Sequence, residues 1–105
     1  MDLRDMQKEV DEWVKPFNPP YWPPHQQLAR LTEETGEVAR EINNLHGVKK
    51  RKPGEPEGNL GQELSDVIFT VVCLANSHEV DLDAEWKKMM DQKMYGRDKD
   101  RYEKK

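Results

Sequence analysis

The sequence predicts an all-α fold in which residues 1–105 form a single domain. Apolar residues recur at spacings of three and four along several segments, as on the buried face of an amphipathic helix. Prolines and glycines gather between those segments, where they interrupt helices. The sequence shows no strand-like alternation of apolar and polar residues. The expected architecture is therefore a four-helix bundle-like subunit.

The first two helices are separated by a proline-rich loop. Leu3–Val14 has the helical apolar spacing, and Asn18–Pro24, NPPYWPP, has four prolines in seven residues, which exclude a helix interior. A second helix is predicted from about Gln26 to Leu45. Its apolar positions form a narrow seam of the kind that two packed helices share: Leu28, Leu31, Thr35, Val38, Ile42 and Leu45.

Two further helices are expected after the glycine-containing loop HGVKKRKPGEPEGN. Leu60–Asn76 is apolar around most of its circumference, which is typical of a buried helix. A chain of 105 residues has little with which to surround such a helix, so we expect subunits to meet there. The last helix begins near Asp83, with Asp81 or Asp83 as its N-cap. Apolar residues mark its inner side: Leu82, Trp86, Met89, Met90 and Met94.

Composition limits the classes of partner. The net charge of −4 disfavours binding to a DNA or RNA polymer. The N-terminal segment has no apolar signal sequence, and the longest apolar run, VIFTVVCLA, is too short to span a membrane. We therefore expect a cytoplasmic protein without a membrane partner. The single cysteine, Cys73, cannot form an intrachain disulfide and is expected to be a buried thiol.

The stretch TEETGEVARE places four glutamates in ten residues of the second helix. Like charges on one helix face destabilise the helix, so their distribution around it matters. At about 100° per residue, Glu34, Glu37 and Glu41 fall along one flank of the apolar seam, and Glu33 falls on the opposite side. Glu33 is therefore expected to face solvent. For Glu41 we expect either a solvated position or an ion pair on the side of Arg40.

The third helix carries a matching acidic pair, Glu63 and Asp66, beside its apolar face. If the second and third helices pack antiparallel, this pair converges with Glu34 and Glu37. Four converging carboxylates cannot all stay ionised without a counter-charge. All-oxygen ligands suit Mg²⁺ or Mn²⁺, and the Glu-x-x-His motif of di-iron bundles does not occur. The pattern favours a Mg²⁺ site over the competing interpretation, two acidic pairs on solvated helix faces.

Two cations continue the inner face of the last helix. Lys93 and Arg97 fall within about 20° of Trp86 on a helical wheel. They either extend along the surface at the end of a fraying helix or reach an anion. Carboxylates, a hard cation and inward-facing bases together are typical of a site for a metal-bound polyphosphate.

The motifs EETGE and ELSD resemble the MazG-like family of nucleotide pyrophosphohydrolases, in the all-α NTP pyrophosphatase superfamily. The family pattern is Glu-x-x-Glu, a gap and Glu-x-x-Asp, and the similarity runs from about Leu28 to Arg101. The resemblance implies four or more helices, assembled as a homodimer or homotetramer. It also implies Mg²⁺-dependent hydrolysis of a nucleoside triphosphate, a non-canonical or deoxynucleotide among the candidates, to monophosphate and pyrophosphate, as nucleotide-pool house-cleaning.

The resemblance also assigns roles to individual side chains. Four carboxylates would be metal ligands: Glu34, Glu37, Glu63 and Asp66. Glu34 would in addition orient or deprotonate the attacking water, and Lys93 and Arg97 would hold phosphates.

Base recognition is the least determined part of this assignment. Trp22 either stacks on a base or fills space between helices, and Asn76 is a weaker candidate for a nucleotide contact. Relatives often have an aromatic residue where this chain has Thr70. Two alternative functions remain at this point: a non-catalytic metal-binding helical scaffold, and a related phosphoribosyl-ATP or dUTP-type hydrolase.

Overall fold

A computed structural model of the chain describes residues 1–48, 51–55 and 58–105. The described residues form helices without a strand, which confirms the predicted all-α class: α1 (Leu3–Val14), α2 (Pro24–His46), α3 (Leu60–Ser77), α4 (Leu82–Met89) and its π-helical continuation η1 (Met90–Arg97). In the predicted loop between α2 and α3, residues 49–50 and 56–57 lie outside the described part. No helix of the described residues is long and apolar enough to cross a membrane.

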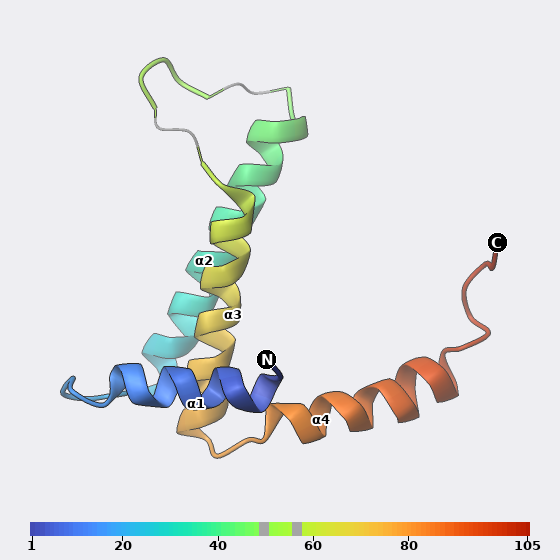
Figure 1. Ribbon diagram of the computed structural model, residues 1–105. Helices are drawn as coiled ribbons and strands as arrows, with labels where there is room; N and C mark the ends of the chain where they lie inside the picture. Colours follow the sequence, from blue (N-terminus) through green and yellow to red (C-terminus); the bar gives the residue numbers. More distant parts are fainter. Residues whose placement is uncertain (49–50, 56–57) are drawn as a thin grey trace.

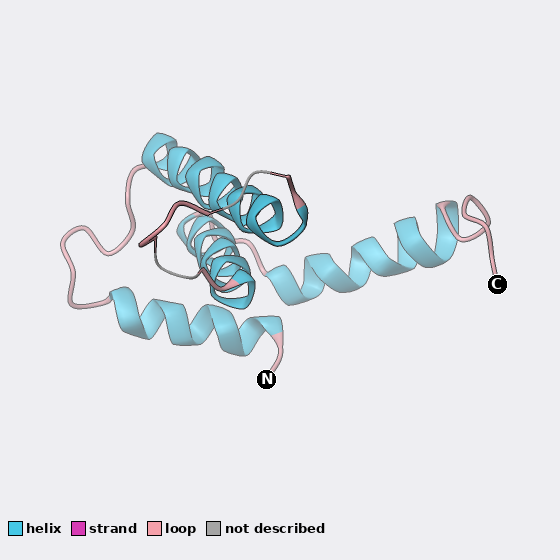
Figure 2. Cartoon of the chain, turned by 90° about the horizontal axis from the view of Figure 1, so that it is seen from above, coloured by secondary structure: helices cyan, strands magenta, loops and turns pink. Residues whose placement is uncertain are grey.

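The helices do not form a four-helix bundle within one chain. α2 and α3 lie side by side and antiparallel, and α1 crosses them near the lower end of the pair in Figure 1. In the view from above, α1 lies beside α3 (Figure 2). In the same view, α4 with η1 extends to the right, away from the other helices, as a projecting arm. The bundle arrangement is therefore wrong for a single chain, in which α1–α3 make the body.

Local sequence signals explain where each helix begins. The Asp2 carboxylate caps α1 by accepting a hydrogen bond from the Asp5 N–H, and the Asp5 carboxylate accepts one from the Asp2 N–H. Pro24 opens α2, a position where its missing N–H costs nothing. The Asn59 side chain caps α3 and the Asp81 side chain caps α4. Of the two caps predicted for α4, Asp81 is the correct one.

The apolar seam predicted for α2 is not its packing face. The buried residues of α2 are Gln27, Glu34 and Glu41, spaced seven apart, so the face that meets α3 is polar and is rotated by about 60° from the seam. Leu28 stays 56% exposed, and Ile42 and Leu45 are exposed as well. The prediction that this seam is buried is wrong within one chain, because the acidic flank occupies the contact.

The apolar core is small and lies where α1 crosses α3. Val10 and Val14 of α1 pack against Val72 of α3, with Tyr21 and Leu82 at the edge. Within one chain α3 is not surrounded, because four of its large apolar residues are exposed: Leu64, Ile68, Phe69 and Val71. That subunits meet at this helix stays a prediction. Of the inner side predicted for α4, Leu82 reaches the core, whereas Trp86 on the arm is exposed.

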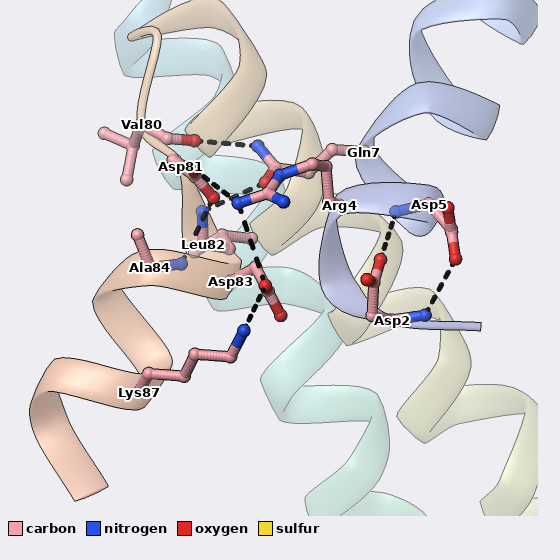
Figure 3. A network of polar contacts seen from close by, with 10 residues as sticks. All are labelled: Asp2, Arg4, Asp5, Gln7, Val80, Asp81, Leu82, Asp83, Ala84 and Lys87. Atoms are coloured by element: carbon pink, nitrogen blue, oxygen red, sulfur yellow. Dashed lines mark hydrogen bonds and ion pairs between the residues drawn. The ribbon is translucent and has the colours of Figure 1, made fainter. Parts of the chain in front are cut away.

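A polar network fastens the arm to α1 (Figure 3). The Gln7 amide donates to the Val80 carbonyl oxygen at 2.7 Å and accepts from the Leu82 N–H at 3.0 Å. Arg4 donates to the Asp81 carboxylate at 3.1 Å. The Asp81 carboxylate also accepts from the Ala84 N–H, and this backbone hydrogen bond, followed by the Arg4 contact, lowers the pKa of Asp81.

Replacing Asp81 with alanine should lower the free energy of unfolding by about 1 kcal/mol near neutral pH, because α4 loses its cap. A lowered folded-state pKa means that the carboxylate stabilises the fold above its unfolded-state pKa and stops doing so as the pH falls through the folded-state pKa. The difference in free energy of unfolding between wild type and the variant should therefore shrink below about pH 4. Urea unfolding at several pH values measures this difference. A difference that does not change with pH would contradict the role of the ionised Asp81 carboxylate as the cap.

Candidate metal centre

Four carboxylates meet where α2 and α3 pack against each other. Glu34 and Glu37 lie three residues apart on α2, and Glu63 and Asp66 lie three apart on α3, so each helix presents both acids of its pair toward the other. One oxygen from each of the four lies within 4.8 Å of the others. The convergence predicted from an antiparallel pair of helices is confirmed.

Glu34 lies deepest in this cluster. Its side chain is 2% exposed, and its Oε1 forms an ion pair with the Arg30 guanidinium, one helical turn earlier, at 2.7 Å. Burial raises the pKa of Glu34, while Arg30 opposes that rise and the charges of Glu37 and Asp66 add to it. Arg30 thus neutralises part of the cluster, and the described residues offer no second cation at this distance from Glu34.

Glu63 shares the same electrostatic conflict. A hydrogen bond with the Glu37 carboxyl group raises the pKa of Glu63, and partial burial and the neighbouring negative charges raise it further. Without a metal, the negative charges of the cluster repel one another, which favours the protonated form of Glu63.

The cluster fits a bound divalent cation. Among the described residues, two buried oxygens have no hydrogen-bond partner, Oε2 of Glu34 and Oε2 of Glu63. Leaving a buried acceptor without a partner costs about 1–3 kcal/mol, more for a charged group. A cation bound between the helices would give both oxygens a partner and offset the negative charge of the cluster. Four carboxylates make an all-oxygen ligand set, which suits Mg²⁺ and Mn²⁺.

The other two glutamates of the stretch differ from this group. Glu33 has a side chain that is 62% exposed, as predicted. Glu41 is buried, and its carboxylate lies 3.4 Å from the Arg51 guanidinium of the following loop, with Gly58 against it. The expectation of a solvated Glu41 or a pair with Arg40 is wrong, because the loop folds back over α2 and supplies a different cation.

A cavity of about 600 Å³ opens beside the carboxylates. Asp66 and Arg30 belong to both the cluster and the cavity wall. The remaining wall comes from the end of α1, the proline-rich loop, α2 and α3, and includes five aromatic residues: Trp13, Phe17, Tyr21, Trp22 and Phe69. Its other residues are Val14, Asn18, Pro19, Pro20, Gln27, Thr70 and Cys73. The sequence analysis missed Arg30, although its i, i+4 spacing to Glu34 signals an ion pair.

The predicted phosphate-binding side chains lie outside this region. Lys93 and Arg97 belong to η1, which projects away from the α2–α3 pair (Figure 1). Arg97 also forms an ion pair with the buried Asp98 carboxylate at 3.1 Å, which Arg101 reaches as well. Within one chain these two cations are not brought to the carboxylates.

The two candidate base-binding residues have different environments. Trp22 is half-exposed and lines the cavity. The Asn76 amide donates to the Gln7 carbonyl oxygen and to the Tyr21 hydroxyl, both at 2.9 Å, and accepts from the Gln7 amide at 2.8 Å. Asn76 thus links α3 to α1 and the loop, with all its polar atoms engaged.

Comparison with known proteins places this geometry in a family. The MazG nucleotide pyrophosphohydrolase domain matches residues 23–102, which include all four carboxylates. The chain belongs to the MazG family. The family assignment suggested by the two acidic motifs is thereby confirmed, and with it the classification as a nucleotide pyrophosphohydrolase enzyme.

Individual MazG relatives agree with this assignment. The chain is 42% identical over 103 residues to the uncharacterized protein YpjD of Bacillus subtilis (strain 168), covering 98% of this chain and 92% of YpjD. The crystal structure of YpjD, described as a candidate pyrophosphatase, is similar with a TM-score of 0.78 at 39% identity, covering 89% of this chain and 95% of that one. A Bacillus-conserved MazG protein, described as a nucleotide pyrophosphohydrolase, gives a TM-score of 0.75 at 39% identity and 88% coverage of both chains.

Magnesium should raise the melting temperature of this MazG protein, because an ion that binds only the folded state stabilises it, by about 2.7 kcal/mol at a hundredfold excess over Kd. Glu34→Gln and Asp66→Asn should abolish the rise, since each removes a ligand charge. Glu33→Gln is the matched control and should keep it. Thermal melts with and without Mg²⁺ measure the effect, and a rise that survives Glu34→Gln but is lost in Glu33→Gln would contradict the site.

Proposed function

We propose that this chain hydrolyses a nucleoside triphosphate to a nucleoside monophosphate and pyrophosphate in a Mg²⁺-dependent reaction, with non-canonical and deoxynucleotides as the candidate substrates. The observation that carries the proposal is the convergence of four carboxylates beside a cavity, in a chain of the MazG family. Hydrolysis at the α-phosphorus would remove unwanted nucleotides from the pool.

The four carboxylates of the cluster would hold the metal. Bound Mg²⁺ supplies charge neutralisation for the phosphate oxygens, which is the main requirement of such a reaction. Glu34 would orient or deprotonate the attacking water, whose oxygen forms a bond to the α-phosphorus while the bond from that phosphorus to the bridging oxygen breaks. The bridging oxygen leaves with the pyrophosphate. The Arg30 guanidinium, on the rim shared by cluster and cavity, would help to hold Glu34 in position.

The aromatic cavity would take the base. Trp22 supports this proposal because it is half-exposed on the cavity wall, where an aromatic ring can stack on a base. Asn76 stays in the proposal in a weaker role, since it holds the Tyr21 hydroxyl at the cavity rather than offering a free polar atom.

Lys93 and Arg97 would hold phosphates of a substrate bound to another copy of the chain. The arm projects from the body, and exposed apolar residues lie on α2, α3 and α4, for example Leu28, Ile68 and Trp86. Exposed apolar surface on several helices favours association. A homodimer or homotetramer would cover it and bring η1 of one subunit to the carboxylates of the next.

The purified protein should convert at least one nucleoside triphosphate to monophosphate and pyrophosphate when Mg²⁺ or Mn²⁺ is present. Chromatography of the products after incubation with a panel of canonical and modified nucleotides measures this. Glu37→Gln should lower kcat/KM by at least a hundredfold, because it removes a metal ligand, whereas Glu33→Gln should stay near wild type.

Two outcomes would reject the proposal. Release of orthophosphate and diphosphate would mean attack at the γ-phosphorus. No turnover of any nucleotide, combined with a metal-dependent rise in melting temperature that Glu37→Gln abolishes, would favour the non-catalytic scaffold instead.

Mixing two inactive variants should restore activity if the arm serves a neighbouring subunit. Glu34→Gln lacks the carboxylate, and Lys93→Gln/Arg97→Gln lacks the arm cations. Random reassortment of dimers should return about a quarter of the wild-type activity, because half of the dimers contain one intact site out of two. The activity of the mixture after co-refolding measures this recovery, and each variant refolded alone is the control.

No recovery from a mixture that light scattering shows to be oligomeric would contradict the shared site. A monomeric wild-type protein with full activity would contradict both the oligomer and the role of the arm.

A further inference from the structure

Gln27 is a buried amide in the wall of the aromatic cavity. It lies on α2, is 4% exposed, and precedes the metal-cluster residue Glu34 by seven residues. Two helical turns place it on the same face of α2 as Glu34, about 10 Å along the helix axis. This separation suits a ligand that extends from the carboxylates into the cavity, as a nucleotide does.

The orientation of the Gln27 amide is fixed from α3. The Ser77 hydroxyl donates to the Gln27 Oε1 at 3.0 Å. The Leu74 carbonyl oxygen lies 3.1 Å from the Ser77 hydroxyl and 2.8 Å from the Nδ1 of His78. When His78 donates to this carbonyl oxygen, the single hydroxyl proton of Ser77 goes to Gln27. With Oε1 engaged by Ser77, the amide presents its two N–H donors on the other side.

Those donors have no partner. The Nε2 of Gln27 is a buried nitrogen without a hydrogen bond among the described residues. A buried donor without an acceptor is destabilising, and such groups are rare in folded proteins. A ligand in the cavity that supplies an acceptor would satisfy this donor.

We propose that Gln27 recognises the base of the bound nucleotide by donating a hydrogen bond to a carbonyl oxygen, which favours uracil, thymine, cytosine and oxopurines over adenine. The proposal rests on the proposed function, since it takes the cavity as the base site. Trp22 and Phe69 give the cavity a largely apolar, aromatic wall against which a base can pack. In such a wall a donor placed for an exocyclic carbonyl oxygen selects strongly, because adenine has only ring-nitrogen acceptors, at other positions, and leaves the donor unpaired.

The first experiment compares Gln27→Met with wild type on uridine and adenosine triphosphates and on their deoxy forms. Wild type should favour the uracil nucleotides in kcat/KM, and Gln27→Met should reduce that preference by about tenfold, the effect of one neutral hydrogen bond. Methionine keeps the length of the side chain and removes the unpaired donor, so the melting temperature should be unchanged or higher. Gln26→Met, the exposed neighbour on the same helix, is the matched control and should keep the wild-type ratio.

A second experiment does not depend on turnover. The side-chain amide signals of Gln27 in a ¹H–¹⁵N spectrum are the pair that disappears in Gln27→Met. Uridine monophosphate should shift one of these protons downfield, and adenosine monophosphate and inorganic pyrophosphate should not. If nucleotides are hydrolysed while these signals stay in place and Gln27→Met keeps the wild-type ranking of bases, the inference is wrong and the proposed function stands. If uridine monophosphate shifts the signals and no nucleotide is hydrolysed, the proposed function fails and the recognition by Gln27 stands.

Discussion

The contact between α2 and α3 is made through carboxylates, and this constraint shapes the rest of the molecule. Helices in small domains usually pack through apolar stripes, but here Glu34 is the most buried residue of α2 and faces Glu63 and Asp66. Arg30 neutralises part of the charge, and the neighbouring carboxylates raise the pKa of Glu63. The close approach of the two helices therefore depends on a counter-charge, and an all-oxygen cation site is the arrangement that satisfies every ligand.

The acidic contact also determines where the apolar surface goes. Since the face carrying Gln27, Glu34 and Glu41 turns toward α3, Leu28 and Leu45 lie beside the contact and remain exposed. The core shifts to the crossing of α1 and α3, which is too small to cover the other apolar residues of α3. A chain built in this way exposes apolar surface next to its functional site, so association and chemistry are expected to be linked.

Two amide side chains near the cavity differ in whether their hydrogen-bonding atoms have partners. Asn76 looks like a binding residue in the sequence, yet each of its polar atoms has a partner and it holds α1 against α3. Gln27 carries no such signal in the sequence, yet its amide nitrogen has no partner. Residue type alone cannot separate these cases, because hydrogen-bond satisfaction depends on neighbours more than forty residues away, such as Ser77.

The sequence by itself determined the features that depend on local geometry. The apolar spacing and the prolines that follow it predicted Leu3–Val14 as α1. The i, i+3 spacing placed the two acids of each pair on one helix face. Apolar spacing and acid spacing can be interpreted locally because an α-helix has 3.6 residues per turn. Only the tertiary structure decided which face of α2 meets α3, that Arg51 buries Glu41, and that the arm carrying Lys93 leaves the body. Two faces about 60° apart are nearly equivalent on a helical wheel. The choice between them is made by groups distant in sequence, through the cost of leaving buried charges unpaired.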